Sequence, residues 1–196
     1  MARPRRYDHD ELRAACVEAA RRLLDEGGPS ALTARALARA VGATPGTVYA
    51  VFGSMKGVLL EVNRATFAEL SAIVDAVPPD DPDRWLARLA DAYVEFMLAR
   101  GDVWRGLFEG QRETEAFPPW YDALIDGLIE RIAAPLGALG AGDRSRALAE
   151  QLFVSVHGAV ALAAIGRLDM VTPRDARTLA REAVAVMVAA IRAGRA

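Results

Sequence analysis

Cysteine, histidine and lysine are scarce in this chain of 196 residues. Cys16 is the only cysteine, so no intramolecular disulfide can form. The only histidines are His9 and His157, and neither has the spacing of a metal site or of a nucleophile–base pair. No glycine-rich phosphate loop with a lysine is present either. The sequence therefore argues against an enzyme, a metal centre and a bound cofactor.

Long uncharged runs are missing as well. Residues 151–166, one of the two longest, are shorter than a membrane-spanning helix and contain a histidine. The N-terminus is rich in arginine and no apolar segment follows it, so a secretory signal peptide is not expected. We therefore expect a cytoplasmic protein with no membrane partner.

What the chain does contain is apolar residues and an uneven distribution of charge. Hydrophobic residues make up 53% of it, which is typical of a globular protein with a substantial core. Residues 1–56 hold nine basic and six acidic residues, whereas residues 57–196 hold fifteen and twenty. A basic head on an acidic body is typical of a phosphate-binding part joined to a regulatory part.

Apolar residues recur at helical spacing and no strand-like alternation stands out, so the sequence predicts an all-α protein of about nine helices. The proline-rich segment 78–82 is the clearest break between them. The expected helices lie within residues 8–26, 33–52 (two short helices), 54–77, 83–100, 103–109, 118–139 (with a kink near Pro135), 144–166 and 174–192.

Residues 33–52 have the spacing of a helix-turn-helix. Ala38 is followed four residues later by Gly42, and Val48 comes six residues after that. A small residue lets the two helices cross closely, a glycine takes the turn and an aliphatic residue packs the second helix. The motif predicts a DNA-binding head near the N-terminus.

The surrounding segment, residues 32–62, resembles the recognition region of the tetracycline-repressor (TetR) family of regulators. The matching residues are Leu32, Thr33, Leu37, Ala38, Gly42, Thr44, Gly46, Thr47, Val48, Tyr49, Phe52, Ser54 and Leu59. The resemblance implies a three-helix helix-turn-helix head and a larger helical domain that binds a ligand and forms a dimer. We assign residues 1–56 to the head and residues 57–196 to the ligand-binding and dimerisation domain.

The resemblance also implies which residues touch DNA. They are Thr33, Arg35, Thr44, Pro45, Gly46, Thr47, Tyr49 and Lys56. Thr44 and Pro45 suit the N-cap and the first position of the second motif helix. Arg35 is the candidate for a bidentate guanine contact, and a solvated surface charge is its alternative. Tyr49 is assigned to a phosphate, with a core aromatic as its alternative.

Ten of the thirteen aromatic residues lie beyond residue 56, which suits an apolar ligand pocket as well as an ordinary core. The candidates for ligand contact are Trp85, Phe96, Trp104, Phe108, Trp120, Tyr121 and His157. His157 and Gly158 resemble the His-Gly pair of one C-terminal subclass of the family, and a core histidine is the alternative. We expect an apolar or aromatic effector, although an inward-facing Arg88, Arg105 or Arg112 would select an anion.

The last two expected helices are crowded with small and β-branched residues, which predicts the interface of a homodimer. The candidate interface residues are Ala159, Ala163, Leu179, Ala183, Val186 and Ala190. Together these features predict a repressor that binds a double-stranded DNA operator and is released by a small molecule. The alternatives are a structural DNA-binding protein without an effector and, less favoured, an all-α enzyme.

Overall fold

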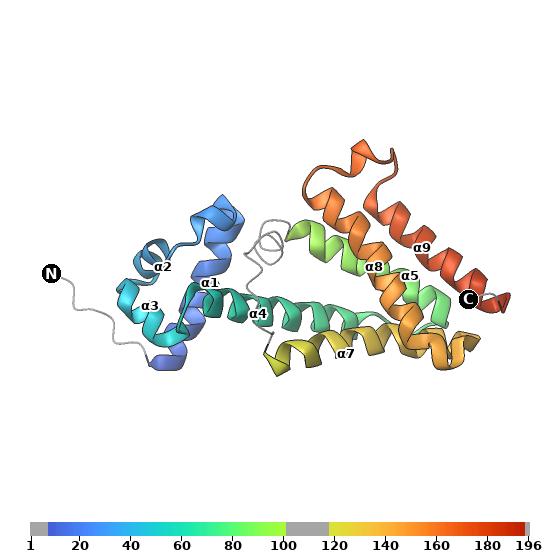
Figure 1. Cartoon of the computed structure of the whole chain (residues 1–196), viewed down its shortest axis with the longest axis horizontal. Helices are drawn as coiled ribbons and strands as arrows, with labels where there is room; N and C mark the ends of the chain where they lie inside the picture. The colour runs from blue at the N-terminus through green and yellow to red at the C-terminus, as the bar shows by residue number, and fades with distance from the viewer. Residues whose placement is uncertain (1–7, 101–117, 195–196) are drawn as a thin grey trace. The chain divides into compact units, whose positions relative to one another are not determined.

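The computed structural model describes residues 8–100 and 118–194 (Figure 1). These residues form α-helices with short 3-10 and π turns and contain no strand, which confirms the predicted all-α class. The α-helices are α1 (His9–Gly27), α2 (Ala34–Val41), α3 (Pro45–Phe52), α4 (Met55–Ala76), α5 (Pro82–Ala99), α7 (Pro119–Leu136), α8 (Ser145–Ala164) and α9 (Ala176–Arg192). The described part thus holds eight of the roughly nine helices expected, and the short helix expected over 103–109 lies outside it.

The chain divides into two compact units, and the division falls inside α4. Among the described residues, the first unit contains 8–68 and Arg100, and the second contains 69–99 and 118–194. The helix α4 is continuous, so it belongs to both units. The boundary expected at residue 56 lies near the start of the same helix.

The first unit is built around the apolar face of α1. Asp8 and Glu11 form a capping box at the start of this helix, which satisfies two backbone N–H groups there. The core residues of the unit come from α1 to α4 and include Cys16, Ala19, Ala20, Leu24, Leu37, Ala38, Val41, Val48, Val58 and Val62. Burial raises the pKa of the Cys16 thiol, so this cysteine acts as a small hydrophobic residue in the core.

The end of α3 and the start of α4 approach each other very closely. Gly53 ends α3 with a φ of 73°, and the hydroxyl oxygen of Ser54 accepts a hydrogen bond from the Gly57 backbone N–H at 3.1 Å. A Cβ atom at Gly57 would overlap the backbone carbonyl oxygen of Phe52. The turn between the two helices therefore requires glycine at position 57.

Arg13 of α1 binds to both sides of this junction. Its guanidinium donates a hydrogen bond from Nη2 to the carbonyl oxygen of Val51 at 3.2 Å. Its Nη1 lies 3.0 Å from a carboxylate oxygen of Glu61, and its Cζ lies 5.2 Å from the centre of the Phe52 ring. One half-buried side chain thus links α1 to the end of α3 and to the first turns of α4.

In the second unit α9 packs against α5 and α8, and α7 packs against α8 (Figure 1). Arg181 of α9 forms a bidentate ion pair with the Asp91 carboxylate of α5, with Nε at 2.8 Å and Nη2 at 2.7 Å from its oxygens. The chain breaks between α7 and α8 as expected, with Gly140 at a φ of 104°. Pro135 lies inside α7, one residue before that helix ends.

The stretch Pro119–Ala164 is long and apolar enough to cross a membrane by length and composition, and 22% of its most apolar window is buried. This is weak evidence for a span, because the stretch consists of two helices separated by the break at Gly140. The two helices also pack on each other within the second unit.

Replacing Gly57 with alanine should destabilise the first unit, because the new methyl group meets the Phe52 carbonyl and the backbone must shift. We expect Gly57→Ala to lower the free energy of unfolding by about 1–3 kcal/mol, measured by thermal or urea denaturation. The control is Gly127→Ala, since a Cβ at this exposed position inside α7 meets nothing within 4 Å. Alanine there should be neutral or stabilising by up to about 1 kcal/mol, and equal losses in the two variants would contradict the close approach.

Candidate functional site

The first two helices after α1 have the geometry of a helix-turn-helix. Thr33 caps α2, and its Oγ1 accepts a hydrogen bond from the Ala36 N–H at 3.1 Å. Gly42 ends the helix in the left-handed conformation, with φ 69° and ψ 29°. The N–H of Ala43 then donates to the Ala38 carbonyl at 2.8 Å, which closes the turn. Each role matches the residue type that the motif predicts.

The second motif helix, α3, begins with the predicted cap. Thr44 accepts a hydrogen bond from the Thr47 N–H at 3.2 Å, and the two threonine hydroxyl oxygens lie 2.9 Å apart. Pro45 is the first helical residue, and Val48 is the side chain of α3 that is fully buried in the core. Of the other residues of α3, Thr47, Val51 and Phe52 are half-buried, and the exposed ones are Pro45, Gly46, Tyr49 and Ala50.

The residues assigned to DNA are accessible. Exposed are Thr33, Arg35, Thr44, Pro45, Gly46 and Tyr49, while Thr47 and Lys56 are half-buried. The Tyr49 side chain is 47% exposed, so it is not a core aromatic. The structure therefore brings all eight residues to the surface of one unit, on α2, α3 and the start of α4.

The electrostatics of this surface favour an anion. Neither α2 nor α3 has an acidic residue in its first turn, where backbone N–H groups carry partial positive charge. Residues 27–60 contain no Asp or Glu at all, although they contain Arg35, Arg39 and Lys56. This acid-free run is a signal in the sequence that motif spacing alone does not use. Arg39 is exposed and adds a basic residue to those expected.

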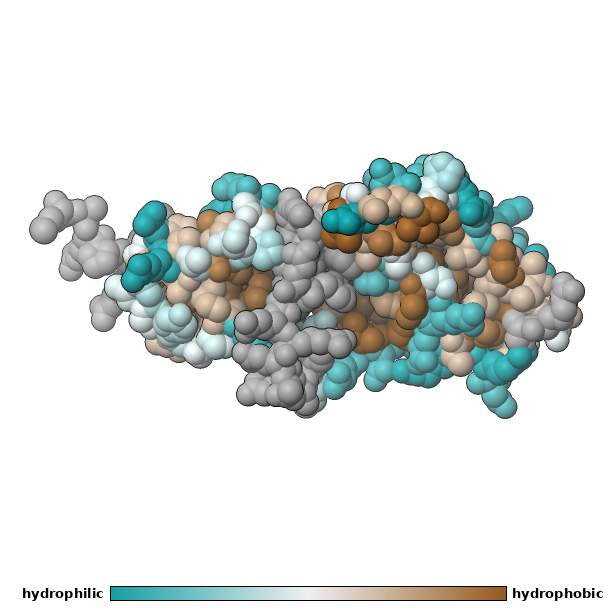
Figure 2. All heavy atoms as spheres, turned by 45° about the horizontal axis from the view of Figure 1, so that its top comes forward, coloured by the Kyte–Doolittle hydropathy of each residue, from teal (hydrophilic) through white to brown (hydrophobic). Residues whose placement is uncertain are grey.

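A shallow groove lies between α8 and α9 in the second unit. Four of the expected interface residues line it, namely Leu179, Ala183, Val186 and Ala190. Val186 is 70% exposed and Val154 on α8 is 67% exposed, which is unusual for large apolar side chains. Ala159 and Ala163 are half-buried on α8. Figure 2 shows hydrophobic surface gathered over this part of the second unit.

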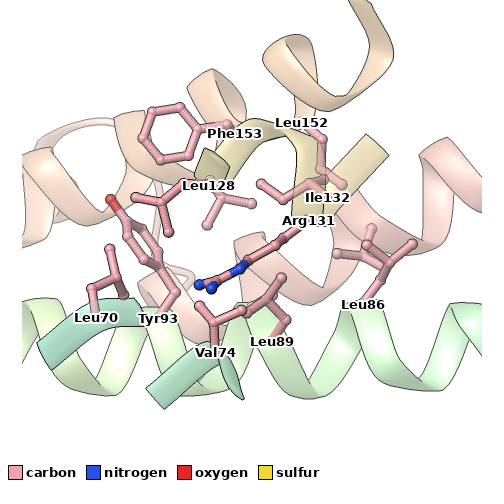
Figure 3. Close-up of a pocket in the computed structure, with 13 residues that line it drawn as sticks. Leu70, Val74, Leu86, Leu89, Tyr93, Leu128, Arg131, Ile132, Leu152 and Phe153 are labelled. Atoms are coloured by element: carbon pink, nitrogen blue, oxygen red, sulfur yellow. The ribbon is translucent and has the colours of Figure 1, made fainter. Parts of the chain in front are cut away.

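The second unit also has a half-open apolar cavity of about 60 Å³ between α4, α5, α7, α8 and α9 (Figure 3). Its lining residues are Leu70, Val74, Leu86, Leu89, Ala90, Tyr93, Leu128, Arg131, Ile132, Leu152, Phe153, Val156 and Val184. Arg131 is the only charged residue among these described lining residues. Sequence patterns did not single it out, because its spacing on α7 resembles that of a surface arginine.

Tyr93 and His157 form a polar pair beside the cavity. The Tyr93 hydroxyl lies 2.5 Å from Nδ1 of His157, and the ring of Phe153 packs near both rings. Burial lowers the pKa of His157 and raises the pKa of Tyr93 far above its ordinary value. At neutral pH both groups are therefore uncharged, and the tautomer of His157 decides which of them donates the hydrogen bond.

None of the described residues that were expected to contact a ligand lines this cavity. Phe96 is buried, Trp85, Trp120 and Tyr121 are half-buried, and His157 contacts the lining residue Tyr93. Trp104 and Phe108, like Arg105 and Arg112, lie outside the described residues. Helical spacing identifies an apolar face, but branched aliphatic side chains from several helices surround the cavity. Arg88 pairs with Asp80 at 3.0 Å and does not line the cavity either.

Two family models match the chain. Residues 17–62 match the model described as bacterial regulatory proteins, tetR family, and residues 86–192 match the tetracyclin repressor-like C-terminal domain. The chain belongs to the TetR family. Members of this family are DNA-binding transcriptional regulators, and the first match covers α2, α3 and most of α1. No curated protein matches the chain.

Solved structures share this TetR fold. A protein of unknown function from Rhodococcus sp. RHA1 is 22% identical, with a TM-score of 0.74, covering 96% of this chain and 98% of its own. The regulator SCO7222, a TetR from Streptomyces coelicolor, is 22% identical, with a TM-score of 0.69 and coverages of 92% and 97%. Thermus thermophilus FadR, a TetR family repressor solved in complex with lauroyl-CoA, is 17% identical, with a TM-score of 0.64 and coverages of 90% and 93%.

No group of three or more His, Cys, Asp or Glu side chains that could hold a metal ion occurs within residues 8–100 and 118–194. TetR regulators are generally not enzymes. The histidine that resembles the family's His-Gly pair instead forms the Tyr93 contact described above.

The buried His157 should make stability depend on pH. Because burial lowers its folded-state pKa, the unfolded chain takes up a proton first as the pH falls through the ordinary value of about 6.5. The contribution of the neutral His157 to the free energy of unfolding is therefore fully present above that pH and decreases below it. In His157→Gln, which keeps an acceptor for Tyr93 but cannot titrate, the melting temperature should fall less between about pH 7.5 and about pH 5.5. His9→Gln, at an exposed position in the first unit, is the control, and identical pH profiles for all three proteins would refute the assignment.

Proposed function

We propose that this TetR family member is a repressor that works in the cytoplasm, binds an operator as a homodimer and is released by a small apolar molecule. The observation that carries the proposal is the exposed surface of α2 and α3. Two capped helix N-termini lie there in a run of 34 residues, 27–60, without any acidic side chain. DNA phosphates are the anions that such a surface suits best.

Each exposed residue has a role in this proposal. The N-capping hydroxyls of Thr33 and Thr44 and the hydroxyl of Tyr49 donate hydrogen bonds to phosphates, and Lys56 adds charge. Arg35 extends from the first turn of α2 and reads a guanine edge. Gly46 and Thr47 occupy the start of α3, where the absence of a bulky side chain at Gly46 lets the backbone approach the groove.

Dimer formation is the second part of the proposal. Regulators of the TetR family act as dimers, and a pair of heads reads two half-sites about one DNA turn or a multiple apart. The groove between α8 and α9 supports an interface there, since large apolar side chains such as Val154 and Val186 face solvent beside it. A four-helix contact between two copies would bury them.

The effector is the third part. The apolar lining of the cavity supports an apolar ligand. The lining includes residues from the second half of α4, and the first half of this helix belongs to the first unit. FadR, with the same fold, was solved with lauroyl-CoA, a molecule that has a long apolar chain. Ligand and operator then oppose each other through α4, because each favours a different arrangement of the same helix. A structural DNA-binding protein without an effector would show no ligand response.

Substitutions on the DNA surface should separate base contacts from phosphate contacts. After an operator has been selected from random duplex DNA, Arg35→Ala should weaken binding to it by about 1–3 kcal/mol and affect random DNA less. Tyr49→Phe should weaken binding to both by about 1 kcal/mol, because a phosphate contact carries no sequence information. Lys56→Ala should reduce the slope of log K against log salt by roughly one unit per subunit.

Fluorescence anisotropy at several salt concentrations measures these effects. Arg22→Ala, which removes an exposed arginine from α1 in the same unit, is the charge-matched control. If Arg22→Ala and Arg35→Ala lose the same affinity on operator and on random DNA, Arg35 does not read a base.

A charge introduced into the α8–α9 face should prevent dimer formation. In the monomer, Val186→Arg costs little because the position is 70% exposed, but in the dimer it buries an unpaired charge, a loss of about 3–5 kcal/mol. Light scattering should report monomers, and operator binding should decrease with the loss of the paired heads. Ala123→Arg, at an exposed position of α7, is the control and should remain dimeric. A dimeric Val186→Arg protein would place the interface elsewhere.

A further inference from the structure

One charged residue, Arg131, lines the apolar cavity, and it does so with its hydrocarbon stem, while its guanidinium pairs with the exposed Asp75. Figure 3 shows this side chain extending from α7 toward Val74 of α4, with Tyr93 on one side and Leu89 on the other. Every other described lining residue is apolar except Tyr93, whose hydroxyl is engaged by His157. A ligand that enters the cavity therefore meets apolar walls, and the guanidinium of Arg131 is the positive charge nearest to them among the described lining residues.

The contacts of the Arg131 guanidinium with α4 are weak enough for another anion to replace them. Its Nη2 alone contacts both carboxylate oxygens of Asp75, at 3.1 Å and 3.4 Å, and Nη1 reaches the carbonyl oxygen of Ser71 at 3.5 Å. By contrast, Arg181 donates hydrogen bonds to Asp91 from two nitrogens, at 2.7 Å and 2.8 Å. The Asp75 side chain is also 64% exposed, and exposed ion pairs of this kind contribute little to stability.

Both partners of Arg131 lie in the last turns of α4. The ion pair to Asp75 and the hydrogen bond to Ser71 thus link α7 to the part of α4 that belongs to the second unit. The cavity beside them has room for about two water molecules, so a ligand of drug size must widen it. Widening between Val74 and Leu128 moves α4 relative to α7 and strains this link.

We propose that the cavity binds a molecule with an aliphatic or aryl chain and one carboxylate, and that Arg131 exchanges Asp75 for the carboxylate of this ligand. The chain of the ligand fills the apolar space, and its carboxylate takes two nitrogens of the guanidinium, the geometry that arginine favours. The exchange releases α7 from α4. This part of the inference rests on the proposed function, in which α4 carries the response to the operator-binding head.

The test compares octanoate, 1-octanol and octylammonium, which share one chain and differ in the charge of the head group. Binding to the full-length protein is measured by calorimetry and by the shift of the melting temperature, below the concentrations at which the probes aggregate. Octanoate should bind most tightly. Equal binding of octanoate and octanol, or a preference for octylammonium, would overturn the proposal.

Two variants test the exchange itself. Arg131→Gln keeps a polar side chain of similar length but removes the charge, so octanoate binding should fall about tenfold while octanol binding stays the same. Asp75→Asn removes the competing carboxylate, so octanoate should bind several-fold more tightly. The control is Arg146→Gln, which removes an arginine paired with Asp126 at 2.6 Å on the surface of α7 and α8, away from the cavity.

If Arg131→Gln binds octanoate as well as wild type does, or if Asp75→Asn binds it more weakly, Arg131 does not hold the carboxylate. Circular dichroism and the unchanged binding of octanol show that each variant is folded. Octanol that no longer binds to Arg131→Gln would also count against the proposal, since the apolar walls should not need the charge.

The proposed effect of the ligand on DNA binding is tested separately, by measuring operator affinity. Octanoate should lower operator affinity of the wild-type protein, and Asp75→Asn should lower it without ligand. Operator binding that ignores octanoate, while calorimetry still shows binding through Arg131, would refute the link to α4 and leave the ligand class standing. A chain that binds no DNA at all would refute the proposed function, and the calorimetry would still decide the ligand class.

Discussion

The junction between α3 and α4 is the constraint on which the DNA-binding unit depends. Gly57 leaves room for the Phe52 carbonyl, and Arg13 contacts Val51, Phe52 and Glu61 around it. A recognition helix of eight residues is too short to be stable alone, so its direction must come from such contacts. Because α3 contacts the first turns of α4, the proposed mechanism requires a displacement of α4 to reach the helix assigned to DNA.

The other end of the same helix belongs to the second unit. There α4 contributes Leu70 and Val74 to the cavity wall and Asp75 to an ion pair with Arg131. Apolar packing is not directional, so it tolerates a widened cavity. A guanidinium, by contrast, forms its bidentate ion pair with one carboxylate at a time. In the proposed mechanism this combination gives α4 two arrangements that a ligand can exchange, as opposed binding of effector and operator requires.

Local chemistry explains why the head could be predicted so closely. Thr33, Gly42 and Thr44 are cap and turn residues, whose conformations depend on neighbours within four positions along the chain. For Tyr49 the family resemblance implied a phosphate contact and left a core aromatic open, and the structure decided between them by exposing the side chain. The acid-free run 27–60 was visible in the sequence as well, but the balance of charge over the whole head partly conceals it.

By itself, the sequence determined the all-α class, the capped helix-turn-helix and the apolar faces of the body helices, since each depends on residues close together along the chain. Only the tertiary structure decided that Gly57 must be glycine and that Tyr93 engages His157. It also decided that Arg131, rather than Arg88, is the arginine of the cavity. These features depend on residues that meet across helices, and the periodicity of one helix cannot show which side chains of another helix it faces.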